Sequence, residues 1–290
     1  MPELLPLSSG YYIWHYVPNV ALSVVASVAW IGIGAALSWK MWKTRTWFCS
    51  CFAIGCFMEL VGYAARAAAA NKTNELVPYM IQSALILLPP VLFAATIYMC
   101  LGRLIRYLSA SHLSIIRPSR LTKIFVGGDI VSFLIQGNST PFAVLGDKNP
   151  IFPKLGQALV LLGLAVQLIS FCLFTYTAMV FHRRLKAAPT ERSWVADQDW
   201  VKVMHMLYCT SGLIILRSLF RIVEYAMGND GYPLTHEWTL YAFDTIPMLA
   251  VCGLFFWWYP VCLAGVPKNG DVEHVPLETQ VSRQSLVRKH

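Results

Sequence analysis

The stretch Arg217-Ser-Leu-Phe-Arg221-Ile-Val-Glu224 carries three charged residues at positions i, i+4 and i+7, which an α-helix places on one face. The segment around them, about 203–223, is otherwise apolar and long enough to cross a bilayer. A charged residue at the bilayer centre costs about 2.5–3.5 kcal/mol on insertion scales, so such residues usually face a polar interior. The stretch therefore predicts a membrane helix with a functional polar face.

The composition of the whole chain is that of a membrane protein. Its 290 residues are 57% hydrophobic and 13% charged, whereas soluble domains carry about 25% charged residues. The net charge of +8 comes from basic residues that gather in particular loops. This distribution follows the positive-inside rule, and nucleic acid is therefore not an expected partner.

Seven apolar segments predict an all-α, polytopic fold with seven transmembrane helices. The segments are 17–39, 47–65, 78–101, 124–142, 155–181, 203–223 and 240–259. We expect an extracellular N-terminus (1–16), a transmembrane bundle (17–262) and a disordered cytosolic tail (263–290). The fourth segment is the weakest candidate for a membrane helix, because it is short and contains Gly127, Gly128 and Gly137. Pro89, Pro90 and Pro247 lie inside apolar segments, so we expect kinks there.

Loop charges predict the orientation of the bundle. Lysine and arginine concentrate in the first, third and fifth loops and in the tail, which places the N-terminus outside and the C-terminus in the cytosol. Two glycosylation sequons, at Asn71 and Asn138, fall on the predicted outer side. All eight cysteines lie in or beside apolar segments, so no disulfide framework is expected.

Polar side chains form helical stripes inside several of the apolar segments, with charges of opposite sign on different helices. These stripes have two interpretations. Their ion pairs could lock the bundle together, or they could line a water-accessible cavity that binds the polar head of an amphipathic ligand. The residues predicted to form this polar cavity are Glu59, Arg66, Asp129, Gln136, Gln167, Arg217, Arg221, Glu224, Tyr241 and Asp244.

The same stripes resemble a known family. Glu59-x-x-Gly-Tyr-x-x-Arg66, Asp129-x-x-Ser-x3-Gln136, Arg217-x3-Arg221-x-x-Glu224 and Glu237-x3-Tyr241-x-x-Asp244 are similar to motifs of the fungal lipid-translocating exporter family, which is RTA-like and has seven helices. The resemblance covers about residues 59–260. It implies export of sphingoid long-chain bases, resistance to toxic amphiphiles and drugs, and location in the plasma membrane. Two departures leave the substrate open: Asn138-Ser139 replaces an expected glycine run, and Tyr259-Pro260 stands where His-Pro is expected.

The predicted function is a membrane transporter or translocase that exports or flips amphipathic, sphingoid-base-like lipids or toxic amphiphiles. No phosphate-binding loop is present, so energy would come from a gradient, and an energy-independent scramblase is equally open. The alternative is a seven-helix sensor or receptor for a lipid-like ligand. The seven histidines lie in loops, tails or segment ends, so no enzyme activity, catalytic residue, metal or cofactor is expected. The expected partners are the bilayer and an amphipathic substrate, and the oligomeric state is left open.

Overall fold

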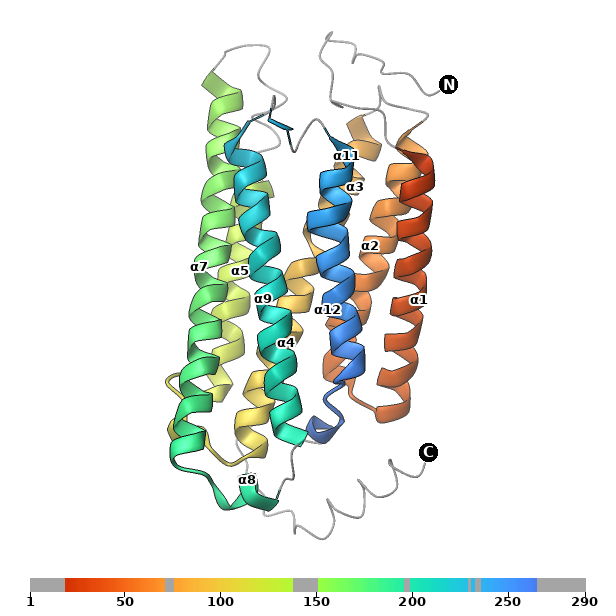
Figure 1. Cartoon of the computed structure of the whole chain (residues 1–290). Coiled ribbons are helices and arrows are strands. Elements are labelled where there is room, and N and C mark those ends of the chain that lie inside the picture. Colours follow the sequence, from red (N-terminus) through yellow and green to blue (C-terminus); the bar gives the residue numbers. More distant parts are fainter. Residues whose placement is uncertain are drawn as a thin grey trace.

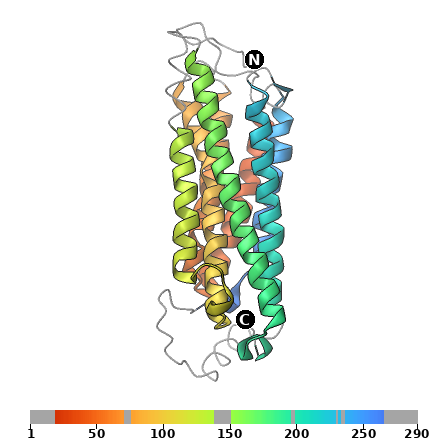
Figure 2. The same ribbon diagram turned by 90° about the vertical axis from the view of Figure 1, so that its left-hand side faces the viewer.

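The computed structural model describes residues 19–70, 76–137, 151–195, 199–228, 231–232 and 236–264, and every regular element within them is a helix (Figure 1). The long helices run roughly parallel in one elongated bundle (Figures 1 and 2). This confirms the all-α prediction for the described residues. The long elements are α1 (Val20–Thr44), α2 (Ser50–Ala69), α3 (Leu76–Leu87), α4 (Pro89–Tyr107), α5 (Pro118–Gly137), α7 (Ile151–Ala187), α9 (Asp199–Ala226) and α12 (Ile246–Trp257). The short ones are η1 (Trp47–Cys49), η2 (Ser111–Leu113), α8 (Glu191–Val195), α11 (Glu237–Leu240), η4 (Tyr241–Thr245) and η5 (Val261–Leu263), of which α11 and η4 continue directly into α12.

Two groups of sequence predictions lie outside the described residues. They are the two sequons, at Asn71 and Asn138, and the terminal regions 1–16 and 265–290.

Six helical segments of the described chain are long and apolar enough to cross a membrane. They are Val20–Thr44, Trp47–Ala69, Ile81–Tyr107, Lys154–Ala187, Asp199–Ala226 and Glu237–Trp257. The remaining predicted segment, 124–142, corresponds to α5, which is a 20-residue helix but is not among the six. Every 18-residue stretch of α5 contains Arg120, Lys123 and Asp129, whereas each of the six segments has an apolar stretch of that length with at most two charged residues.

The outward surface of the bundle is apolar, as a lipid-facing surface must be. Val25, Leu134 and Ile169 are examples of large apolar side chains that are exposed on different helices. Trp42 and Trp257 are also exposed, near the ends of their helices. Exposed tryptophan near the ends of membrane helices is typical of the membrane–water interface.

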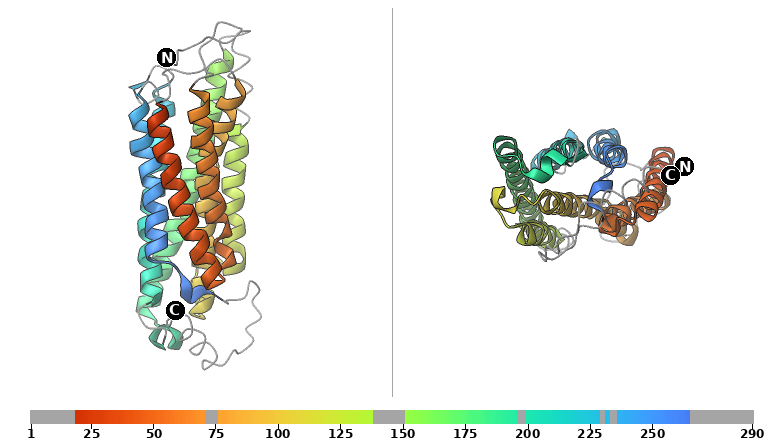
Figure 3. Two further views of the ribbon diagram at one scale, coloured as in Figure 1. Left: turned by 90° about the vertical axis from the view of Figure 1, so that its right-hand side faces the viewer. Right: turned by 90° about the horizontal axis from the view of Figure 1, so that it is seen from below.

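The helices pack in a closed ring. Following the contacts, the order is α1, α2, α4, α5, α7, α9, α12 and back to α1. α4 also contacts α9 across this ring. The view from below, on the right of Figure 3, looks along the helices of the ring. We call the part bounded by α1, α2, α4, α9 and α12 the first sector, and the part bounded by α4, α5, α7 and α9 the second sector. α4 is thus a wall that the two sectors share.

Proline explains the two irregular points of the bundle. α3 ends at Leu87 and α4 begins at Pro89, so the predicted kink is confirmed as a break between two helices. Because proline has no backbone N–H, Pro90 cannot donate the helical hydrogen bond to the Ile86 carbonyl, four residues earlier. The second irregularity is the π-helical turn η4, which lies directly before the helix that contains Pro247. π-Helical turns occur frequently at functional sites.

Candidate functional site

Five buried charged residues meet in the first sector, and we call them the central cluster: Glu59, Arg217, Arg221, Glu224 and Asp244. Asp244 is the hub, because each of its carboxylate oxygens pairs with a different arginine. One oxygen contacts Nε of Arg217, and the other lies 3.2 Å from Nη2 of Arg221. Arg221 also donates from Nη1 to Glu224 at 2.8 Å. The predicted meeting of oppositely charged stripes is therefore present for these residues.

Local structure aims these side chains at one another. In α9 the three charged residues follow the helical spacing read from the sequence, so they share one face. Asp244 belongs to the π-helical turn η4, and its side chain is 2% exposed. In this wider turn the backbone hydrogen bonds join residues five apart, as between the Ile246 N–H and the Tyr241 carbonyl, at the level of the ion pairs. The cluster thus joins a regular helix to an irregular one.

Arg217 also compensates for the helix break in the α3–α4 segment. Its Nη2 donates to the Ile86 carbonyl at 3.5 Å. This is the carbonyl that Pro90 deprives of its helical donor. A backbone carbonyl inside a bilayer needs a partner because no water is available. Arg217 therefore supplies both a counter-charge for Asp244 and a donor for the broken helix.

Glu59 is the member of the cluster without a direct partner. It is 2% exposed and close enough to Asp244, Arg217 and Arg221 for their charges to act on it, but it makes no hydrogen bond within the described structure. The cluster contains three carboxylates and two guanidiniums, and both guanidiniums bind other carboxylates. Glu59 is therefore a surplus buried acid.

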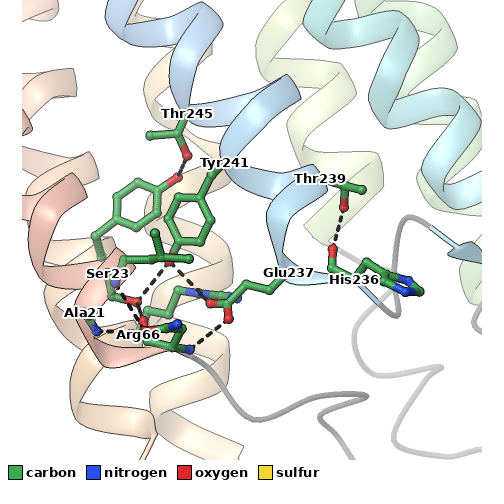
Figure 4. Close-up of polar contacts among 11 residues, drawn as sticks. Ala21, Ser23, Arg66, His236, Glu237, Thr239, Tyr241 and Thr245 are labelled. Atoms are coloured by element: carbon green, nitrogen blue, oxygen red, sulfur yellow. Dashed lines mark hydrogen bonds and ion pairs between the residues drawn. The ribbon is translucent and has the colours of Figure 1, made fainter.

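Arg66 and Tyr241 belong to a second group, which we call the end cluster because it lies where α1 begins and α2 ends. Nη2 of Arg66 pairs with Oε1 of Glu237 at 3.0 Å. The backbone N–H of Asn19 donates to Oε2 of Glu237 at 2.8 Å, and the Tyr241 hydroxyl lies 3.1 Å from the hydroxyl of Ser23. Figure 4 shows the side chains of Ser23, Arg66, Glu237 and Tyr241 converging from α1, α2, α11 and η4. The end cluster ties three chain segments together at one end of the first sector.

A further hydrogen bond lies between the two clusters. The hydroxyl of Tyr63 on α2 bonds to the hydroxyl of Thr245, the residue after Asp244 (Figure 4). Tyr63 is buried and its ring lies 6.0 Å from that of Tyr241. One hydrogen bond and one ring contact of Tyr63 thus join α2 to η4 between the two clusters.

Gln136 and Gln167 lie apart from both clusters, at the contact between α5 and α7. Nε2 of Gln136 donates to Oε1 of Gln167 at 3.4 Å. Gly163 makes this approach possible, because a Cβ there would lie 2.6 Å from Cγ of Gln136 and 2.8 Å from the Ser132 carbonyl. Close packing through small residues is the common means of association for membrane helices.

Asp129 is also separate from the central cluster, since it lies in the second sector. Its Oδ2 accepts a hydrogen bond of 2.9 Å from the Tyr98 hydroxyl of α4. The predicted polar set is thus divided into four places: the central cluster, the end cluster, the glutamine pair and Asp129. Two partners, Glu237 and Tyr98, were missing from the predicted set. Glu237 already formed a helical motif with Tyr241 and Asp244 in the sequence but was not included among the predicted cavity residues, whereas Tyr98 has no helical stripe of its own.

Within the described ranges, no three His, Cys, Asp or Glu side chains gather in a way that could hold a metal ion. Apart from Glu59, the acids and arginines of the central cluster are paired with one another. Its chemistry is that of charge recognition inside a low-dielectric interior.

Comparison with known proteins identifies relatives of the chain. Residues 52–266 match the profile of the family described as RTA1 like protein. The chain is 37% identical over 204 residues to Protein RTM1 and 38% identical over 200 residues to Protoporphyrin uptake protein 1, both of Saccharomyces cerevisiae. Each match covers 69% of this chain and just under two thirds of the relative, 63% and 64% respectively.

A more distant relative has a name that states a lipid substrate. It is Sphingoid long-chain base transporter RSB1 of Saccharomyces cerevisiae, which is 22% identical over 263 residues, covering 80% of this chain and 69% of the relative. No solved structure matches the chain.

Proposed function

The chain belongs to the RTA1-like family of fungal, lipid-translocating exporter-like membrane proteins, and from this premise we propose that it moves amphipathic molecules with a cationic head across the bilayer. The chain is a multi-pass membrane protein with six helices suited to span a membrane. We further propose that α5 is a seventh span, since it packs between α4 and α7 along the bundle. The loop charges support an extracellular N-terminus and a cytosolic C-terminus. The resemblance to the exporter family supports a place in the plasma membrane.

The observation that carries the proposal is the surplus acid of the central cluster. Glu59 is buried and makes no hydrogen bond in the described structure, while both neighbouring arginines form ion pairs with other carboxylates. A buried carboxylate without a partner is costly. The ammonium group of a long-chain base would provide the missing counter-charge and up to three donors. Its hydrocarbon tail is compatible with the apolar surroundings of membrane helices, so the head group is the part that needs a specific site.

The relatives' names suggest two kinds of cargo. One relative is named for a sphingoid base and another for protoporphyrin. A porphyrin with carboxylate groups would be attracted by the arginines and repelled by Glu59, whereas an ammonium group would prefer Glu59. The surplus of carboxylates favours the cationic cargo. Export would then give resistance to toxic cationic amphiphiles.

The test uses the purified full chain in liposomes with a fluorescent sphingoid base, whose loss from one leaflet is followed by quenching. We expect movement by the wild type and a drop of about tenfold or more in apparent affinity with Glu59→Gln, because a hydrogen bond to a charged group is worth about 1.5–3 kcal/mol. Asp199→Asn is the matched control, since Asp199 is an exposed acid on α9.

Three results would change the proposal. Movement of protoporphyrin that improves with Glu59→Gln would reassign the site to an anionic cargo. Equal movement by wild type and Glu59→Gln would remove Glu59 from the site. No movement of either compound by well-folded protein would favour the alternative, a sensor or receptor for a lipid-like ligand.

A further inference from the structure

The second sector contains a buried carboxyl group that is only half satisfied. Oδ2 of Asp129 accepts the hydrogen bond from Tyr98, but Oδ1 is buried and has no hydrogen-bond partner in the described structure. Asp129 is 1% exposed and Tyr98 is fully buried. Buried polar atoms in proteins nearly always have a partner, so an exception requires an explanation.

Aromatic side chains surround this pair. The Tyr98 ring lies 5.5 Å from that of Phe125, 5.7 Å from that of Phe171 and 4.5 Å from that of Phe174. These rings come from α5 and α7, the two helices that close the sector beside α4. Rings offer no acceptor or donor of hydrogen-bond strength to Oδ1. The hydrogen-bonded pair therefore places a single carboxyl group in an apolar environment.

No basic side chain of the packed helices neutralises Asp129. On α4 the group that faces it is Tyr98, and the charges of Arg103 and Arg106 lie near the end of that helix. On α5 the basic residues are Arg120 and Lys123, in its first two turns. α7 carries no charged residue between Lys154 and His182, and its ionisable side chains in that range, Cys172 and Tyr176, are exposed. The central cluster, with its arginines, lies in the other sector.

We propose that Asp129 and Tyr98 form a proton-binding site, separate from the central cluster, at which the Asp129 carboxyl takes up and releases one proton. In uptake, a proton from water forms an O–H bond with Oδ1 while Tyr98 continues to donate to Oδ2. In release, the O–H bond breaks and the proton returns to water. No other bond changes.

A proton fits this site better than a larger cation. A metal cation such as Na⁺ needs several oxygen ligands around it, by analogy with the oxygen cages of hard cations. Here the Tyr98 hydroxyl is the one hydrogen-bond partner of Asp129 in the described structure, and the Ser132 and Thr122 hydroxyls donate to backbone carbonyls, at 3.0 and 3.5 Å, and not to the carboxylate. One carboxyl and one phenol remain. Isolated membrane carboxyls of this kind are the usual carriers of protons.

The shared wall offers a route from this site to the substrate site. Tyr98 is on α4, which contacts α9, the helix of Arg217 and Arg221. Gly127 and Gly128 directly precede Asp129, and glycine weakens a helix. A local opening of α5 would admit water to Asp129. A shift of α4 would move its contact with α9 and so change the positions of the arginines in the central cluster. This coupling, unlike the proton site itself, rests on the proposed transport function.

The first experiment detects the proton without any transport. Infrared difference spectra of the full chain in liposomes, between acidic and alkaline buffer, should contain a protonated-carboxyl band that is lost in Asp129→Asn. Tyr98→Phe keeps the carboxyl and should shift this band, because its hydrogen bond is lost. Glu59→Gln is the matched control and should leave the band in place. A spectrum unchanged by both Asp129→Asn and Tyr98→Phe would overturn the proposal.

The second experiment tests the coupling. One proton exchanged per substrate can drive about a tenfold concentration ratio for each unit of pH difference. We expect the wild type to concentrate a fluorescent long-chain base in this way. Asp129→Asn should still exchange the base at equal concentrations but should reach a ratio of about one. Accumulation driven by a sodium gradient instead would overturn the choice of a proton, and unchanged accumulation by Asp129→Asn would overturn the coupling. If the wild type moves no base, the infrared result alone decides the proton site.

Discussion

Asp244→Asn is expected to lower the free energy of unfolding by about 3 kcal/mol. The aspartate is 2% exposed, and each of its oxygens binds a different arginine. Asparagine has the same shape, but one of its two positions becomes an NH₂ donor facing a guanidinium donor. Removing one partner of a buried ion pair costs about 3–5 kcal/mol. The lower end applies here because Arg217 keeps the Ile86 carbonyl and Arg221 keeps Glu224.

Denaturation of the reconstituted protein in mixed micelles by increasing detergent measures this difference. Asp199→Asn is the control on the same helix, because its pair with Lys202 is solvent-exposed and should be worth about 0–1 kcal/mol. The double variant Asp244→Asn with Arg217→Gln should cost less than the sum of the two single changes, since the guanidinium left without its aspartate is then gone.

The reasoning fails if Asp244→Asn costs no more than about 0.6 kcal/mol, which is the average for a side-chain hydrogen bond between membrane helices. It also fails if the two single changes add fully, because the pair would then have no energy of its own.

Three further changes test other parts of the structure. Gly163→Ala should destabilise the bundle by about 1–3 kcal/mol, since the new methyl group would lie 2.6 Å from Cγ of Gln136, whereas Gly212→Ala, with open space around it, should stabilise α9 by up to about 1 kcal/mol; thermal unfolding of both variants in detergent compares them. Pro90→Ala restores a donor for the Ile86 carbonyl and should straighten the α3–α4 break, so spin labels at positions 83 and 99 should move apart towards the distance of about 24 Å of a continuous helix, and an unchanged distance would contradict the account. Glu237→Gln should speed amide hydrogen exchange at Asn19, whose N–H the carboxylate accepts at 2.8 Å, and should leave exchange in α5 as it is; equal rates at Asn19 in both proteins would count against the end cluster.

The parts of the site that were predictable are those set by one helix. Arg217, Arg221 and Glu224 share a face because of their spacing alone, and the α3–α4 break follows from two adjacent prolines. Partner choice depends instead on how helices far apart in the chain cross and at which register. Sequence spacing therefore could not show that Arg66 pairs with Glu237 and not with an acid of the central cluster.

The division into sectors was equally invisible in the sequence. Asp129 and Glu59 have the same appearance there, as single acids in apolar segments. They lie in different sectors because α4, which packs between α2 and α5, also contacts α9 on the other side of the ring. The fold class needed only the lengths of the apolar segments, which is why it was more accessible than the grouping of the polar residues.

The hydrogen bond from Arg217 to the carbonyl freed by Pro90 makes two distant positions depend on each other. A chain that loses Arg217 would leave the Ile86 carbonyl without a hydrogen-bond donor in the membrane. A chain with another residue at position 90 would regain the backbone donor, and Arg217 would then be needed only as the counter-charge of Asp244. If both are lost, the backbone satisfies the carbonyl, and Asp244 keeps Arg221 as its remaining arginine. Across related sequences, the proline and the arginine should therefore be inherited or lost as a pair.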